Sequence, residues 1–179
     1  METVEKPEDD GFLRAAAPLR EVRQSMHAGL NTLQVAATAI TTAESRFALA
    51  SLDAAMEYLR EQLLPGCRAE EATIFAAFES VTGAPNACRV MRAQHTSILR
   101  MAGDLAQVVE AAQVAGDLAE YAKYLQPLLF GLYALCRVHL ESEDEAYVAT
   151  LEAMLSHHQV VTLAGQFELA LGRGSEPGE

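Results

Sequence analysis

Several long stretches of the chain repeat apolar side chains every three or four residues, which is the period of an α-helix buried on one side. The first stretch follows Pro18, a residue suited to the first turn of a helix, and stops at the segment TTAES. Its apolar stripe consists of Leu19, Val22, Met26, Leu30, Leu33 and Ala37. The pattern therefore predicts a long amphipathic helix that begins just after Pro18.

The same period returns in the rest of the chain. The further predicted helices cover about residues 46–80, 88–114, 118–155 and 159–171. Pro65-Gly66 should kink the second helix, because proline removes a backbone donor and its ring meets the preceding turn. Long amphipathic helices with short links predict an all-α, up-down-up-down antiparallel four-helix bundle with a short extra C-terminal helix.

Composition agrees with a single helical domain. Half of the 179 residues are hydrophobic, and alanine and leucine dominate while β-branched residues are sparse. We expect residues 13–171 to form the bundle domain. On either side we expect a flexible acidic leader, residues 1–12, and a flexible tail, residues 172–179.

Charge and cysteine content restrict the function classes. The net charge of −12 argues against nucleic acid or an anionic membrane as a partner. The three cysteines lack CxxC spacing, which favours reduced buried thiols over disulfides. The first residues contain no apolar signal segment, and no apolar run is long enough to span a bilayer. We therefore expect a cytoplasmic protein, as a monomer or homodimer.

The stretch CRVHLESEDEAYV contains the first candidate chemistry. His139 and Glu143 are four residues apart, so both lie on one face of the predicted helix. One such pair is close to a chance event in a chain with 5 histidines and 25 acidic residues. Its position is unusual, however, because both side chains share the apolar stripe with Leu132 and Cys136. A carboxylate there is unfavourable unless it is paired or binds a metal ion.

The other predicted helices repeat this anomaly. Glu70 falls on the line of Cys67 and Ile74, His95 lies between Met91 and Ile98, and His27 lies beside Met26. Imidazole and carboxylate groups in the core of a helical bundle are typical ligands of iron or manganese. The sequence thus predicts a metal site made by His27, Glu70, His95, His139 and Glu143.

These residues resemble the hemerythrin-like HHE cation-binding domains over roughly residues 18–155. The matching stretches are LREVRQSMHAGL, LLPGCRAEEATIF, MRAQHTSI and LYALCRVHLESEDEAYV. The resemblance implies a non-haem di-iron centre with Glu70 and Glu143 as bridging carboxylates and the three histidines as terminal ligands. It also implies handling or sensing of oxygen, peroxide or nitric oxide, and leaves open whether the protein is an enzyme. Manganese and zinc suit the same donors.

The sequence departs from the family at Gly66, where these domains carry a histidine four residues before the glutamate of the second helix. Three interpretations remain open. Water takes the vacated position, or another side chain fills it, with Cys67 (paired with Glu71) and Tyr133 as the candidates. Alternatively the bundle is metal-poor or mononuclear and acts as a structural or regulatory interaction module. Asp144 offers a further carboxylate next to Glu143.

Overall fold

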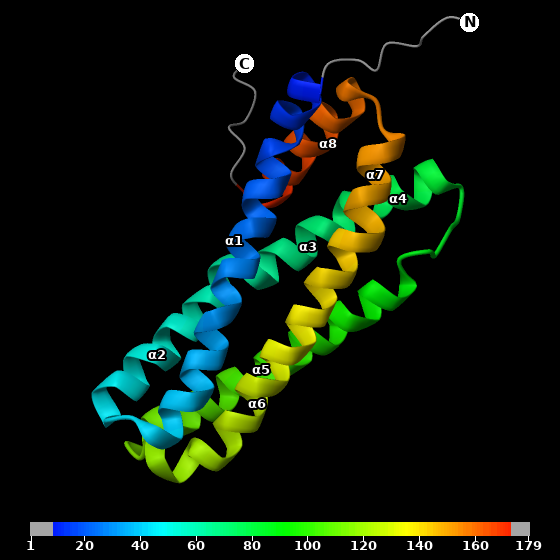
Figure 1. Cartoon of the computed structure of the whole chain (residues 1–179). Coiled ribbons are helices and arrows are strands. Elements are labelled where there is room, and N and C mark those ends of the chain that lie inside the picture. Colours follow the sequence, from blue (N-terminus) through cyan, green and yellow to red (C-terminus); the bar gives the residue numbers. More distant parts are fainter. Residues whose placement is uncertain (1–8, 173–179) are drawn as a thin grey trace, which may run out of the picture.

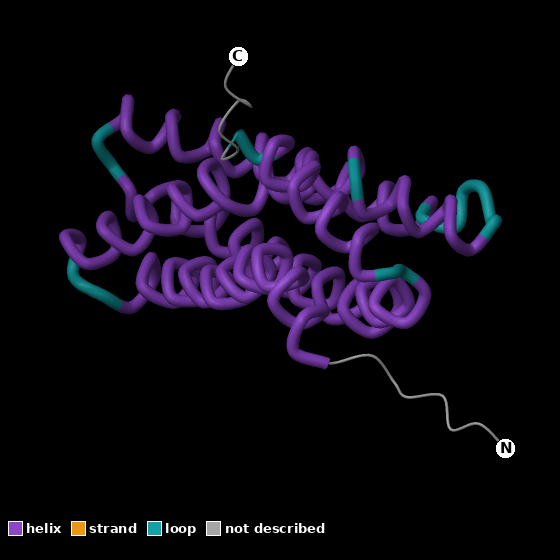
Figure 2. Tube along the Cα trace, turned by 90° about the horizontal axis from the view of Figure 1, so that it is seen from above, coloured by secondary structure: helices purple, strands orange, loops and turns teal. Residues whose placement is uncertain are grey.

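The computed structural model describes residues 9–172, and every regular element in this range is helical (Figure 2). The α-helices are α1 (Asp9–Thr42), α2 (Ser45–Tyr58), α3 (Leu64–Ala72), α4 (Ile74–Thr82), α5 (Arg89–Ala115), α6 (Leu118–Glu143), α7 (Ala149–Met154) and α8 (His157–Ala170). Two π-helical turns interrupt them, η1 (Leu59–Leu63) and η2 (Asp144–Val148). The predicted all-α class is confirmed, and the strict up-down-up-down order stays a prediction.

The long helices lie side by side around a common core (Figure 1). Helix α1 packs against both α2 and α6, and α5 packs along α6. The C-terminal helix α8 lies against α1 and α3. The buried faces are the apolar stripes seen in the sequence, with fully buried leucines such as Leu33, Leu105 and Leu132. Within residues 9–172, no helix has the length and apolarity needed to cross a bilayer.

The first helix begins earlier than the sequence pattern predicts. Helix α1 starts at Asp9, so Pro18 lies inside the helix and not in its first turn. The alanines at 15–17 are strong helix formers and extend the helix before the proline. Part of the expected leader is therefore helical. Its remaining residues 1–8, and residues 173–179 of the expected tail, lie outside the described range.

The kink expected near Pro65-Gly66 takes the form of a π turn. Helix α2 passes into η1, which ends two residues before Pro65, and α3 follows. The wider turn accommodates the backbone where proline offers no hydrogen bond. The second turn, η2, follows Glu143 directly. Both π turns thus border segments that carry predicted metal ligands, which is where such turns are often found.

Candidate metal centre

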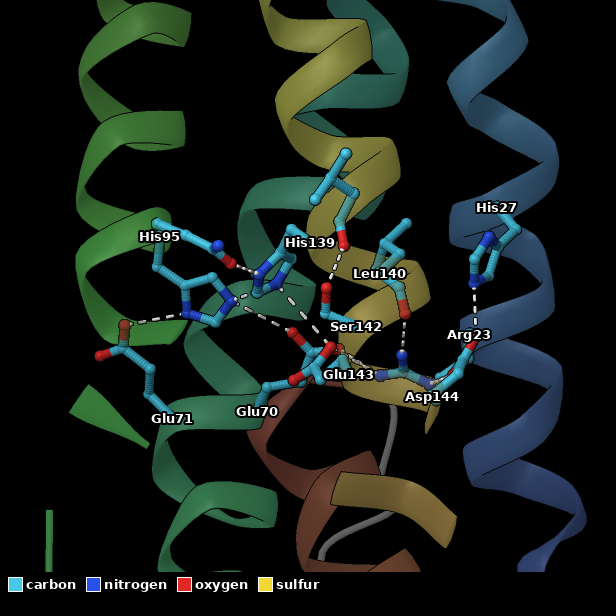
Figure 3. A network of polar contacts seen from close by, with 12 residues as sticks. Arg23, His27, Glu70, Glu71, His95, His139, Leu140, Ser142, Glu143 and Asp144 are labelled. Carbon is cyan, nitrogen blue, oxygen red and sulfur yellow. Dashed lines mark hydrogen bonds and ion pairs between the residues drawn. The ribbon is translucent and has the colours of Figure 1, made fainter. Parts of the chain in front are cut away.

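Four of the five predicted ligands converge in the core. Glu70 of α3, His95 of α5, and His139 and Glu143 of α6 each offer one ligand atom, and these atoms lie within 4.8 Å of one another (Figure 3). All four residues are fully buried. They meet because each occupies a position on the apolar stripe of its helix, so helix packing brings them to one point.

The two imidazoles point their Nε2 atoms at each other, 2.9 Å apart. Their other ring nitrogens are held from outside: Nδ1 of His95 donates to Glu71 Oε1, and Nδ1 of His139 donates to Gln94 Oε1, both over 2.9 Å. Since each Nδ1 carries the hydrogen, both Nε2 lone pairs are directed at the same place. Such an approach requires a proton or a metal cation between them.

The two carboxylates add unsatisfied acceptors at the same place. Glu70 Oε2 and Glu143 Oε1 are buried and have no hydrogen-bond partner. Glu70 Oε2 lies 3.5 Å from His95 Nε2, and Glu143 Oε2 lies 3.7 Å from His139 Nε2. Buried acceptors without a protein partner are rare in folded proteins, and these two oxygens are suited to a cation.

The donor spacing fits one metal ion. Atoms that bind an ion at about 2.1 Å are about 3.0 Å apart when at right angles and about 4.2 Å apart when opposite. The contacts of 2.9, 3.5 and 3.7 Å among these donors fall in or next to this range, and all separations in the group stay within 4.8 Å. Glu70, His95, His139 and Glu143 are therefore the residues that can hold a metal ion.

Electrostatics in the cluster favour a neutral His139 and keep protons on its neighbours. Burial and then the charge of His95 lower the pKa of His139 to about 4, so this imidazole is neutral at pH 7. Burial opposes protonation of His95, but the close approach of the Glu70 carboxylate and its charge raise the pKa of His95. Burial and then the charge of Glu70 raise the pKa of Glu143 to about 8. The cluster thus retains protons that a bound metal ion would displace.

Arg23 of α1 is the main residue that the sequence reasoning missed. Its Nη1 donates to Glu70 Oε1 at 3.0 Å and to Glu143 Oε2 at 2.9 Å, and the residue is 4% exposed. Burial would lower the pKa of Arg23, but the charges of Glu143, Glu70 and Asp144 raise it above its usual value. A signal was available, because Arg23 lies on the apolar stripe between Leu19 and Met26.

His27 is not brought to the other four predicted ligands. Its Nε2 lies 2.7 Å from Asp144 Oδ2, and a third of its side chain is exposed (Figure 3). One residue along a helix turns the side chain by about 100°, so His27 stands beside the stripe that Met26 occupies. Asp144 in turn accepts a hydrogen bond from Arg23 Nε at 2.6 Å.

The space in front of Gly66 is filled by Met26. A Cβ at Gly66 would lie 2.8 Å from both Sδ and Cε of Met26. Cys67 is buried but stands outside the group of four donors. Tyr133 lies beside Arg137, and Glu71 acts as the hydrogen-bond partner of His95. Met26, which none of the three interpretations named, therefore packs against Gly66, and those interpretations stay predictions.

One of three comparisons with known proteins gives a match. A family model described as the hemerythrin HHE cation-binding domain matches residues 16–151, a range that includes all four converging donors. Searches of curated proteins and of solved structures find no match.

Proposed function

Because the chain belongs to the hemerythrin HHE cation-binding domain family, we propose that it binds non-haem iron through Glu70, His95, His139 and Glu143. In this proposal the protein handles or senses oxygen, peroxide or nitric oxide. The observation that carries it is the convergence of four buried donors that include two carboxylate oxygens without partners. Bound ferrous iron would supply redox chemistry toward such a ligand. The acidic charge and three free cysteines support a cytoplasmic setting.

The ligand set supports a first-row transition metal. Calcium and magnesium prefer oxygen donors throughout, whereas two imidazoles with two carboxylates suit iron, manganese or zinc. His95 and His139 are also held by outer hydrogen-bond partners, Glu71 and Gln94. Partners of this kind fix the ring orientation and strengthen an imidazole as a ligand.

The surroundings of the site support a small ligand. None of the four donors is exposed to solvent. The ring of His95 is stacked on Phe75, with ring centroids 5.2 Å apart and an interplanar angle of 20°, which leaves the imidazole little freedom. A buried, rigid site of this kind favours a diatomic molecule or peroxide over a larger substrate.

One observation favours the second candidate, a metal-poor bundle that acts as a structural or regulatory interaction module. Arg23 already pairs with both carboxylates, and the imidazoles contact each other. Charge balance in the cluster therefore does not depend on a metal ion alone. The two candidates differ in whether the protein takes up iron and reacts with the small ligand.

The deciding experiment is metal analysis of protein purified without a histidine tag, before and after anaerobic loading with Fe²⁺. We expect bound iron, and consumption of oxygen or hydrogen peroxide by the ferrous protein but not by the stripped protein. Glu143→Ala should abolish both, because Glu143 is a buried donor on the inner face of α6.

Glu141→Ala is the matched control, since Glu141 lies on the same helix but is exposed. It should leave iron content and ligand consumption unchanged. Iron content far below one per chain that does not respond to Glu143→Ala would reject the iron proposal and support the interaction module.

A further inference from the structure

The two buried carboxylates lie between a guanidinium and two imidazoles. On one side, Arg23 Nη1 donates to Glu70 Oε1 and to Glu143 Oε2. On the other side are the Nε2 atoms of His95 and His139 (Figure 3). Each carboxylate therefore uses one oxygen for the guanidinium, and Glu70 Oε2 and Glu143 Oε1 stay without a partner. Glu70 Oε2 faces His95, whereas Glu143 Oε2 contacts both Arg23 and, at 3.7 Å, His139 Nε2. The guanidinium therefore occupies one side of the glutamate pair.

The guanidinium is fixed firmly in this place. Besides its two glutamate contacts, Arg23 donates through Nε to Asp144 Oδ1 at 2.6 Å and through Nη2 to the Leu140 carbonyl oxygen at 3.3 Å. Asp144 is held in turn by Nε2 of His27. An arginine side chain keeps its charge at every pH a protein survives, so this position carries a permanent cation.

We propose that the guanidinium of Arg23 takes the place of a second metal cation between Glu70 and Glu143, so that the chain holds one metal ion and not a pair. Removing the guanidinium would expose a second ion site. Its donors would be the three carboxylates that Arg23 now contacts, from Glu70, Glu143 and Asp144, together with His27, which contacts Asp144. The inference rests on the proposed metal-binding function, and it differs from the iron pair that the family resemblance implies.

The physical reason is competition for the same oxygen atoms. A second ion that shares both glutamates would need Glu70 Oε1 and Glu143 Oε2, which Arg23 Nη1 contacts at 3.0 and 2.9 Å. A divalent ion there would also meet the guanidinium charge at close range in a poorly solvated site, which is strongly unfavourable. On its outer side, Arg23 lines a surface groove together with His27 and Asp144.

The test measures how many ions each chain binds. Full-length protein is stripped with a chelator, loaded with Mn²⁺ or with Fe²⁺ under anaerobic conditions, and analysed for metal after gel filtration. We expect one ion per chain in the wild type, one in Arg23→Lys, which keeps a cation, and two in Arg23→Ala. Arg23→Ala/His27→Ala should return to one, because the second site loses its only imidazole.

Two ions per chain in the wild type, or a single ion in a folded Arg23→Ala variant, would overturn the inference. Electron paramagnetic resonance of the Mn²⁺-loaded wild type gives an answer even if Arg23→Ala does not fold. The spectrum of an isolated ion supports one site, and that of an exchange-coupled pair contradicts it. No bound metal in the wild type would overturn the proposed function itself, and that result is distinct from a count of two.

Discussion

Two regions of the bundle, the apolar end and the polar end, are stabilised in different ways. At the end formed by the α1–α2 and α5–α6 connections, the core is apolar, with Leu33, Leu52, Leu105 and Leu125 buried (Figure 1). Further along, the core contains an arginine, two glutamates and two histidines, all buried. Apolar burial is non-directional and tolerates small errors in packing. A buried charge is stable only while its partners are present.

The largest loss of stability should come from removing the guanidinium of Arg23 at the polar end. Arg23→Met leaves Glu70 and Glu143 buried without their shared partner, and such broken pairs lose about 4 kcal/mol of unfolding free energy. We expect this loss in urea unfolding of chelator-treated protein, and a partial recovery when Mn²⁺ or Fe²⁺ is added, because the ion supplies positive charge to the same carboxylates.

Arg20→Met is the matched control for this variant. Arg20 lies on the same helix and pairs with Glu152, but both side chains are partly exposed. An exposed ion pair contributes about 0–1 kcal/mol, so the control should unfold almost like the wild type. Equal losses for Arg20→Met and Arg23→Met would show that the polar end does not depend on its internal pairing.

A substitution at the apolar end should lower the free energy of unfolding somewhat less, and this loss should not change when metal is added. Leu105 is fully buried, and Leu105→Ala removes apolar contacts and leaves a cavity, for a loss of about 3 kcal/mol. The loss in urea unfolding should be the same with chelator and with Mn²⁺. A loss that shrinks when metal is added would contradict the separation of the two ends.

The outer hydrogen bonds of the site should have a smaller effect, on metal affinity more than on folding. Gln94→Ala removes the acceptor for His139 Nδ1, which holds that ring in its ligand orientation. Loss of such a partner weakens metal binding by about tenfold or more. Competition with a fluorescent chelator measures this change. Gln107 is an exposed glutamine on the same helix, and Gln107→Ala should bind metal like the wild type. Equal metal affinity of the Gln94→Ala and Gln107→Ala variants would refute a positioning role for Gln94.

The smallest effect concerns a surface pair that borders the polar end. Hydrogen bonds from Arg92 lower the pKa of Glu79. Its contribution to stability is therefore complete above the usual glutamate pKa and is lost as pH falls through the lowered value. Glu79→Gln should lower the Tm slightly at neutral pH, and the difference from wild type should vanish in acid. Glu141 forms an exposed pair with Arg137, and Glu141→Gln should shift the Tm less. A Tm difference between Glu79→Gln and wild type that does not change with pH would contradict this account.

The helical pattern predicted the fold class and the convergence of Glu70, His95, His139 and Glu143, because each of them interrupts an apolar stripe. Arg23 interrupts a stripe in the same way, but a lone arginine is usually solvated and gave no chemical hint of a metal site. Its role depends on which acids the other helices bring near it, and this is a property of tertiary packing. The prediction of where α1 begins was wrong for a local reason, because Pro18 is tolerated inside the helix.

The contact between Met26 and Gly66 has a consequence for how this lineage can change. The thioether fits only because position 66 lacks a side chain, so a histidine at 66 and a methionine in this orientation at 26 exclude each other. The two positions should therefore covary among relatives: chains with histidine at the position of Gly66 should have a different residue, or a different rotamer, at the position of Met26. Recovering the missing histidine in this chain would thus require Met26 to be replaced or to adopt another rotamer.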